Sequence, residues 1–326
     1  MHNDFKTAII AILIAFAANI FICPVLIPFL HRLKFGQNVR DDGPQTHLKK
    51  AGTPTMGGLA ILSSFLLSAV FFLKDNNEAI LLIFTTIGFG LIGFIDDYTK
   101  VVKKRSLGLT PKQKLVMQLA VSCAFLFFLM QMDNPVDSYK VVKIPFTSFK
   151  WDMGILFYPF AICFIIGFDN AVNFTDGLDG LASGVTALVS TFFIFVAQAT
   201  GSGVLPVTGA AVGSLMGFLI FNTYPAKVMM GDTGALALGG FVAAVAIMLK
   251  APLFLVIVGF IYVAEAASVI IQVMYFKATK GKRFFKMAPI HHHFEVKGAS
   301  ETQVVSVFYI VTAMLCLVGY LAGGVN

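Results

Sequence analysis

The chain has 326 residues, of which 57% are hydrophobic and only 13% are charged. Soluble domains carry about 25% charged residues, so this composition, with a mean hydropathy of +0.83, excludes an ordinary water-soluble domain and indicates a protein whose apolar surface faces lipid. The four cysteines lie in apolar stretches and form no C-x-x-C pair, which is typical of buried hydrophobic residues and not of a disulfide framework or metal site.

The first apolar run, residues 7–30, contains no charged residue. It is longer than the ~7–15-residue core of a secretory signal, and it can cross a bilayer about 30 Å thick at about 1.5 Å per residue. Nine further apolar runs follow, each bounded by charged or turn-forming residues. We therefore predict an all-α polytopic membrane protein in a single domain, residues 1–326, with ten transmembrane helices at residues 7–30, 57–73, 79–95, 113–130, 154–170, 178–199, 205–221, 234–249, 252–275 and 303–322.

The loops between these runs predict how the chain crosses the membrane. Most of the 24 Lys and Arg residues fall in alternate loops that share a side with residues 32–55, and positively charged loops stay in the cytoplasm. Both termini are then outside, as is a small periplasmic hairpin predicted from the alternating residues 135–150. The net charge of +7 is concentrated on the inner face, where it attracts lipid headgroups and phosphate-rich substrates. The sequence contains no nucleic-acid-binding motif.

Four loops on the predicted cytoplasmic side carry polar residues at the ends of apolar runs. Ordinary solvated loops are charged, but they do not concentrate polar groups at helix ends. The convergence therefore predicts an active site at this membrane face. In chain order, the residues are Asp96 and Asp97, then Asn170, Asn173 and Asp176, then Asn222 and Asp232, and finally His291, His292 and His293.

The pair Asp96 and Asp97 ends the third apolar run, where carboxylates are unfavourable because the C-terminus of a helix is already partly negative. Hard divalent cations prefer carboxylate oxygens, so the pair is a candidate Mg²⁺ site or phosphate-handling base. A solvated turn is the plain alternative. The nearby Lys100, Lys104 and Lys112 suit the charge of a pyrophosphate.

The segment 170–180 combines amides, carboxylates and glycines. Asn170, Asn173 and Asp176 are spaced three apart, so a continuing helix places them near one face, and Gly177 permits a turn. Amide donors beside carboxylates suit the hydrogen bonding of a sugar or of uracil, and also the ligation of a cation.

Three further polar features have both structural and functional interpretations. Asp232 either caps the helix that follows or presents its carboxylate to Mg²⁺. The histidines at 291–293 favour phosphate hydrogen bonding over a transition metal, because adjacent side chains rarely point the same way and no Cys accompanies them. Glu265 lies inside the ninth run and must face protein or a cavity; with Ser268 and Gln272 it either packs structurally or borders a lipid groove.

Five long stretches carry these residues: DGPQTHLKKAGTPTMGG (42–58), GFIDDY (93–98), NAVNFTDGLDGL (170–181), MGDTGALALG (230–239) and APIHHHFE (288–295). Together they resemble the phospho-N-acetylmuramoyl-pentapeptide transferase family, the MraY translocases, over the whole chain. The resemblance implies a ten-helix, Mg²⁺-dependent enzyme of the bacterial inner membrane, which is often a homodimer. It implies transfer of phospho-MurNAc-pentapeptide from UDP-MurNAc-pentapeptide to undecaprenyl phosphate, giving lipid I and UMP for peptidoglycan, and inhibition by uridine-type antibiotics such as tunicamycin.

The resemblance also implies roles for single residues. Asp96 and Asp97 match the family's aspartate pair, with Asp96 a candidate base, and both are candidate metal ligands beside the Mg²⁺ ligand Asp232. The family usually has a Phe that can stack on uracil where this chain has Met229. The catalytic histidine motif matches His291 and His292, and the substrate-binding candidates are Lys50, Thr55, Lys100, Lys104, Lys112, Asn170, Asn173, Asp176, Gly177, Asn222, Gln272 and His293.

Two alternative functions remain open from the sequence. A related polyprenyl-phosphate N-acetylhexosamine-1-phosphate transferase shares the aspartate motifs, although the histidine loop and the TPTMGG loop favour the muramoyl enzyme. A membrane transporter would also have about ten helices and buried polar groups. Transporters often show inverted repeats and bind near the membrane midplane, whereas here no repeat is evident and the polar residues gather at one face.

Overall fold

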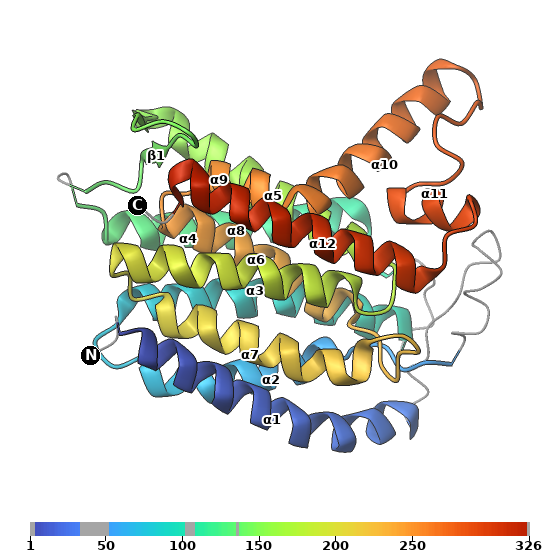
Figure 1. Cartoon of the computed structure of the whole chain (residues 1–326), viewed down its shortest axis with the longest axis horizontal. Coiled ribbons are helices and arrows are strands. Elements are labelled where there is room, and N and C mark those ends of the chain that lie inside the picture. Colours follow the sequence, from blue (N-terminus) through green and yellow to red (C-terminus); the bar gives the residue numbers. More distant parts are fainter. Residues whose placement is uncertain (1–3, 33–51, 102–107, 135–136, 325–326) are drawn as a thin grey trace.

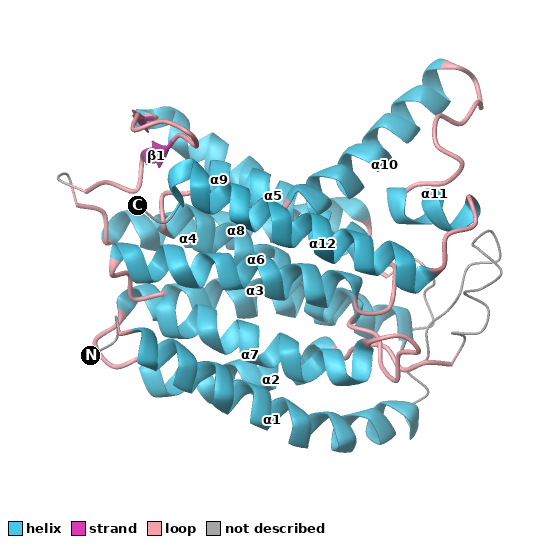
Figure 2. Ribbon diagram, in the orientation of Figure 1, coloured by secondary structure: helices cyan, strands magenta, loops and turns pink. Residues whose placement is uncertain are grey.

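The structure is a computed structural model that describes residues 4–32, 52–101, 108–134 and 137–324. These residues form a bundle of roughly aligned helices with one small hairpin (Figures 1 and 2). The helices are α1 (Phe5–Arg32), α2 (Gly58–Ala69), α3 (Asn77–Val101), α4 (Pro111–Gln131), α5 (Phe157–Thr175), α6 (Leu181–Thr200), α7 (Leu205–Asn222), α8 (Gly231–Met248), α9 (Pro252–Val258), α10 (Phe260–Ala278), α11 (Ile290–Val296) and α12 (Glu301–Gly319).

Within the described residues, nine helices are long and apolar enough to cross a membrane, which confirms the prediction of an all-α polytopic membrane protein. The predicted helix at 57–73 is a shorter apolar helix, Gly58–Phe72. The predicted helix at 252–275 is two helices, because α9 ends before Gly259 and α10 begins at Phe260. Beyond this break, α10 leaves the bundle at an angle, and α11 lies beside it (Figure 1).

Helix α8 forms the centre of the bundle. From Thr233 to Met248 every residue of this helix is buried. This is expected for a helix that contacts protein on all sides. Helices α3 and α5 pack along it. A Cβ atom at Gly93 of α3 would lie 2.1 Å from the carbonyl oxygen of Asp232, so only glycine lets the end of α3 approach the start of α8 this closely.

The outer helices α1, α4, α10 and α12 bury little of their surface. They expose large apolar side chains, among them Phe21, Phe127 and Leu317. An exposed apolar belt of this kind is costly in water and favourable in acyl chains, so these helices form the lipid-facing side of the protein.

The hairpin consists of strands β1 (Val141–Lys143) and β2 (Lys150–Asp152), which pair antiparallel with Lys143 opposite Lys150. This agrees with the predicted hairpin, although its second strand extends beyond residue 150. The hairpin lies at one end of the bundle, and α11 lies at the other (Figure 1).

Candidate active site

Asp97 docks the start of α8 against the end of α3. Its Oδ1 atom accepts a hydrogen bond from the Asp232 N–H at 3.2 Å, and its Oδ2 atom accepts from the Thr233 N–H at 2.9 Å and from the Thr233 Oγ1–H at 2.7 Å. The first N–H groups of a helix have no partner within the helix and carry partial positive charge. The buried Asp97 carboxylate therefore acts as the cap of α8, and it fixes the backbone that carries Asp232.

Lys100 joins two carboxylates that come from different helices. Its Nζ atom lies 2.6 Å from Oδ2 of Asp96, one turn back on α3, and 2.7 Å from Oδ2 of Asp232 on α8. The other oxygen of Asp96 accepts from the Leu109 N–H at 2.6 Å. Two carboxylates this close repel each other unless a cation lies between them, so the Lys100 ammonium group stabilises the arrangement.

Helices α4 and α5 complete this cluster. Asn173 donates from Nδ2 to Oδ1 of Asp232 at 2.7 Å, and Lys114 donates from Nζ to Oδ1 of Asn173 at 3.3 Å. The Lys114 ammonium group also lies 3.8 Å from Oδ2 of Asp232. Each oxygen of Asp232 thus faces a donor or a cation. The sequence analysis named Asn173 but missed Lys114, and Lys112, which it named, is exposed at the start of α4.

A second polar contact lies one turn deeper in the bundle. Gln118 of α4 donates from Nε2 to Oδ2 of the buried Asp169 on α5 at 2.6 Å, and its Oε1 atom accepts from Nδ2 of Asn170 at 3.3 Å. Asn170 also donates to the Ile166 carbonyl at 2.8 Å. Asn170 therefore holds α4 and α5 together below the cluster. The sequence signal for Asp169 and Gln118 was their position inside apolar runs, where polar groups need partners.

The three histidines of α11 have three different partners. The buried His291 places Nδ1 at 3.1 Å from Oε1 of the buried Glu265 on α10. His292 pairs through Nδ1 with Oε2 of Glu295 at 2.9 Å. His293 accepts from the Lys286 N–H through Nδ1 at 3.0 Å. The described residues contain no cluster of three His, Cys, Asp or Glu side chains that could hold a metal.

His291 joins this loop to the end of α5. A Cβ atom at Gly177 would lie 2.2 Å from Nε2 of His291, so the glycine leaves room for the imidazole ring. Asp176 is the C-cap residue of α5, and its N–H donates to the Asn173 carbonyl at 3.3 Å. The predicted segment from Asn170 to Gly177 thus connects the carboxylate cluster with the histidine loop, and Glu265 lies against the other side of His291.

Other predicted residues hold the loops around the cluster. Asn222 is buried, accepts from Ser183 Oγ at 2.7 Å and donates to the Val228 carbonyl at 2.9 Å, so it fixes the loop before α8. Met229 is buried and forms backbone hydrogen bonds with Pro54 and Gly57.

Thr55 lies beside the cluster, whereas Gln272 lies on α10. A Cβ atom at Gly231, beside Asp232, would lie 2.8 Å from Thr55 Oγ1. Gln272 accepts from the N–H groups of Phe284 and Phe285 at 3.1 and 2.8 Å, which ties the chain after α10 back onto that helix. Lys50 and Lys104 lie outside the described residues.

Comparison with known proteins decides the family. A profile described as glycosyl transferase family 4 matches residues 79–250, and phospho-N-acetylmuramoyl-pentapeptide-transferase signature 1 matches residues 50–62. Proteins named phospho-N-acetylmuramoyl-pentapeptide-transferase are similar along nearly the whole chain. The protein from Clostridium kluyveri is 52% identical over 316 residues, or 96% of this chain and 98% of its own. Those from Acetivibrio thermocellus and Staphylococcus carnosus are 51% and 48% identical, over 95% of this chain and 93% and 98% of their own. The chain belongs to the phospho-N-acetylmuramoyl-pentapeptide transferase family.

This family membership explains why the polar residues gather where they do. The glycosyl transferase family 4 match begins in α3 and ends just after α8, so it covers all four helices of the Asp96, Asp232, Asn173 and Lys114 cluster. The part of the transferase described here therefore has one continuous polar region at one end of the bundle. It runs from the carboxylates of α3 and α8 to the histidines of α11.

Proposed function

We propose that this chain transfers phospho-MurNAc-pentapeptide from UDP-MurNAc-pentapeptide to undecaprenyl phosphate, giving lipid I and UMP. The observation that carries the proposal is the single lysine, Lys100, shared by the carboxylates of Asp96 and Asp232 at 2.6 and 2.7 Å. A cluster of cations and carboxylates that can exchange partners suits a substrate with two phosphates. The family name of the relatives supports the choice of sugar.

Lys100 and Lys114 are suited to receive the pyrophosphate. Both ammonium groups lie against Asp232, and both are on side chains long enough to swing toward a ligand while their helices stay fixed. A lysine that gives up a carboxylate for a phosphate keeps a charge-assisted hydrogen bond. Asn173 keeps Asp232 in place during this exchange, because its amide donates to the other carboxylate oxygen.

The transfer itself is a substitution at phosphorus. An oxygen of undecaprenyl phosphate attacks the sugar-proximal phosphorus, and the bond from that phosphorus to the UMP oxygen breaks, so that the electron pair leaves with UMP. Such reactions depend on positioning and on neutralising charge more than on covalent help. A phosphate monoester has a second pKa of about 6, so most of the nucleophile is already dianionic at neutral pH. Asp96 then acts mainly by orienting Lys100 and binding a cation, with only a modest role as base.

Mg²⁺ fits this donor set. Asp96 and Asp232 direct hard oxygen atoms at a single point, now the Lys100 nitrogen, and Mg²⁺ typically takes one or two carboxylates and completes its octahedron with water and substrate phosphates. We therefore propose Asp232 and Asp96 as its ligands, where the ion would neutralise the pyrophosphate. Asp97 is the weaker candidate ligand, because both of its oxygens already accept hydrogen bonds from the start of α8.

An apolar groove next to the cluster suits the prenyl chain. It has a volume of about 290 Å³, lies between α5 and α10, and is lined by residues such as Phe164, Phe168, Val263 and Ile270. Along α5, Phe168 is five residues before Asn173, a distance of about 8 Å. A lipid lying in this groove would bring its phosphate to the carboxylate cluster. Glu265, on the same helix as Val263, does not line this groove, and its carboxylate lies against His291 instead.

The remaining proposals concern location and partners. The distribution of Lys and Arg supports an active site on the cytoplasmic side of the bacterial inner membrane, with both termini outside. Membership of the transferase family supports a homodimer and inhibition by uridine-type antibiotics. An antibiotic of this type would compete with the UDP moiety, which we place near the buried Met229.

Release of UMP tests the proposal. Purified full-length protein with undecaprenyl phosphate and Mg²⁺ is given either UDP-MurNAc-pentapeptide or UDP-GlcNAc. We expect UMP only with the muramoyl substrate, and none when undecaprenyl phosphate is omitted. Release with UDP-GlcNAc alone would move the protein to the related N-acetylhexosamine-1-phosphate transferases. No release with either substrate, from folded protein, would favour a transporter.

A further inference from the structure

The outer half of α10 presents apolar side chains in all directions. The exposed large side chains of this segment are Ile270, Ile271, Val273, Met274, Tyr275 and Phe276. Because a helix turns once in 3.6 residues, a run of this length covers every face. Such a surface is costly in water and favourable among acyl chains. The outer half of α10 therefore lies in lipid beside the bundle, where Figure 1 shows it leaving the other helices.

The loop at the tip of this helix, residues 279–287, is strongly positive, and we call it the basic loop (Figure 1). Its cations are all exposed, and they are Lys280, Lys282, Arg283 and Lys286. No Asp or Glu occurs between Glu265 and Glu295, and those two carboxylates lie against His291 and His292. In the part of the chain that the structure describes, none of the four cations has a carboxylate within ion-pair distance. The described protein therefore leaves the charge of the basic loop unbalanced.

Hydrogen bonds hold the backbone of the basic loop in place. Gln272 of α10 accepts from the Phe285 N–H at 2.8 Å, and the Lys286 N–H donates to Nδ1 of His293 on α11 at 3.0 Å. One guanidinium nitrogen of Arg283 donates to the Lys286 carbonyl at 3.2 Å. A guanidinium group has five N–H donors, so Arg283 keeps others for a ligand. The loop thus presents its cations from a backbone that is tied to both α10 and α11.

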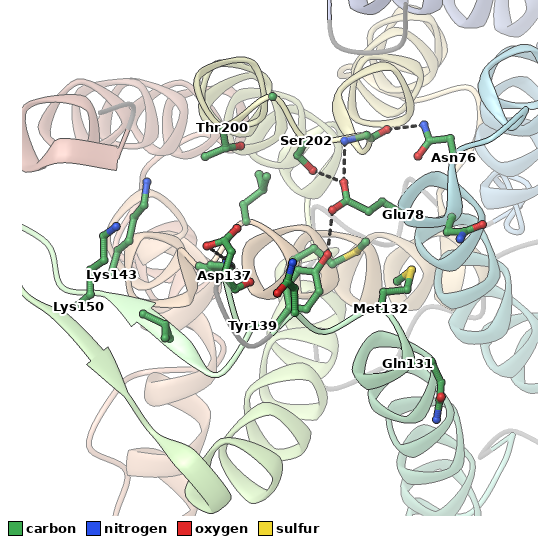
Figure 3. A pocket seen from close by; sticks show the side chains of 18 of the residues that line it. Asn76, Glu78, Gln131, Met132, Asp137, Tyr139, Lys143, Lys150, Thr200 and Ser202 are labelled. Atoms are coloured by element: carbon green, nitrogen blue, oxygen red, sulfur yellow. Dashed lines mark hydrogen bonds and ion pairs between the residues drawn. The ribbon is translucent and has the colours of Figure 1, made fainter.

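The hairpin end of the bundle has a different balance of charge. A pocket of about 1050 Å³ lies there, and its charged lining residues are Asp75, Glu78, Asp137, Lys143, Lys150 and Lys250 (Figure 3). Asp137 forms an ion pair with Lys250. Glu78 accepts hydrogen bonds from three neutral donors, which are the Tyr139 hydroxyl, the Ser202 hydroxyl and the Gly203 N–H (Figure 3). Acidic and basic groups are thus mixed at this end, whereas the basic loop holds cations alone.

We propose that the basic loop binds the phosphates of anionic lipid headgroups in the leaflet around the α11 end of the bundle. Lys and Arg beside a membrane surface attract anionic lipids, and Arg can hold a phosphate with two parallel hydrogen bonds. Exposed Tyr275 and Phe284 flank the cations, and aromatic side chains of this kind settle at the level of the headgroups. A lipid fits both parts of the segment, because its acyl chains cover the outer half of α10. Lipid binding here does not depend on the transfer reaction.

Fluorescence quenching by brominated lipids tests the site at the loop itself. The chain has a single tryptophan, Trp151, so F284W in a W151F background places one reporter next to Arg283. The full-length protein is placed in phosphatidylcholine nanodiscs that contain the same small fraction of either brominated phosphatidylglycerol or brominated phosphatidylcholine. The reporter is measured with the native loop, with K280Q/K282Q/R283Q and with the charge-retaining K280R/K282R/R283K. The matched control is the unaltered chain, whose Trp151 lies between Lys150 and Asp152 on β2.

We expect phosphatidylglycerol to quench the F284W reporter at least about twofold more strongly than phosphatidylcholine, because each cation near the surface favours an anionic lipid. The preference should weaken in high salt, disappear in K280Q/K282Q/R283Q and persist in K280R/K282R/R283K. Trp151 should be quenched equally by the two lipids.

Equal quenching of the F284W reporter by both lipids would overturn the proposal, as would a preference that survives K280Q/K282Q/R283Q or is lost in K280R/K282R/R283K. If the reporter shows no lipid preference but its emission changes when UDP-MurNAc-pentapeptide is added, the loop binds the acidic substrate and the proposal is wrong. Gel filtration and helical circular dichroism confirm that each variant is folded.

Discussion

Glu78 in the first turn of α3 and Asp96, five residues before its end, are carboxylates of one helix with different kinds of partner. Glu78 lies where the helix dipole favours negative charge, and it accepts hydrogen bonds from neutral groups only. Asp96 lies where the dipole opposes it, and its Oδ2 atom depends on the Lys100 cation. A carboxylate satisfied by neutral donors is part of the framework. A carboxylate that depends on a mobile cation can exchange that partner for a substrate.

Removing the shared cation should have a larger effect than any substitution outside the carboxylates that it joins. In Lys100→Gln, Asp96 and Asp232 face each other without the ammonium group, and the pyrophosphate loses a charged contact. We expect kcat/KM for UMP release to fall about 100-fold. The matched control is Lys277→Gln, since Lys277 is exposed in the last turn of α10, and it should change kcat/KM by less than about threefold. Equal losses in the two variants would show that Lys100 has no special position.

Glu78→Gln disrupts the hydrogen bonds that Glu78 accepts at the start of α3. Its amide nitrogen cannot accept from Ser202 or Gly203, so at least one partly buried donor loses its partner. We expect unfolding to become easier by about 1–3 kcal/mol, measured as a lower Tm in detergent. Because the site is about 27 Å away along α3, kcat/KM should remain within about twofold of wild type. A large loss of activity with unchanged Tm would mean that the outer end of α3 takes part in the reaction.

Asp97→Asn weakens the contact between α3 and α8. An asparagine has one acceptor oxygen where Asp97 uses two, so at least one of the Asp232 and Thr233 N–H groups loses its bond. A lost helix cap costs about 1 kcal/mol, and the carboxylate of Asp232 loses its fixed backbone. We expect a smaller decrease in Tm than for Glu78→Gln, together with a lower kcat. An unchanged kcat would contradict this prediction and show that the Asp97 cap does not affect the reaction.

The smallest expected effect is a pH dependence at α11. Burial, with nearby Lys297 and Lys286, lowers the pKa of His293, and its neutral Nδ1 accepts from the Lys286 N–H. Its contribution to stability is therefore complete above the usual His pKa of about 6.5 and is lost as the pH falls through the lower folded-state value. Tm measured from pH 8 to pH 5 should fall less steeply in His293→Asn. Parallel curves would contradict this assignment.

The sequence predicts the helices because their cause is local. Long uncharged runs have to cross the membrane as helices, and the paired aspartates at the end of one run mark the polar end of the bundle. The break at Gly259 was missed, because no charged residue or turn cluster interrupts residues 252–264 and only Gly259 marks the division. Lipid tolerates such residues in a helix, so the sequence alone does not distinguish a bend from a break.

The site was harder to predict because partners depend on helix rotation. Lys112 and Lys114 are two residues apart, and only Lys114 points at Asn173. The capping box formed by Thr110 and Gln113 fixes the start of α4. This motif is visible in the sequence and could have been used to predict which residues of α4 share a face. The contact between Glu265 and His291 had no such signal, because it forms only when the chain leaves the bundle along α10 and returns through α11.

The most direct test compares Asp232→Asn with Glu78→Gln in the UMP release assay with UDP-MurNAc-pentapeptide and undecaprenyl phosphate. Both substitutions remove one negative charge, the first where carboxylates share a lysine and the second where neutral donors surround the carboxylate. We predict that Asp232→Asn lowers kcat at least about 100-fold while Glu78→Gln keeps near-normal kcat in folded protein. Near-normal UMP release by Asp232→Asn, or equal losses in the two variants, would contradict a reaction centred on the carboxylates of α3 and α8.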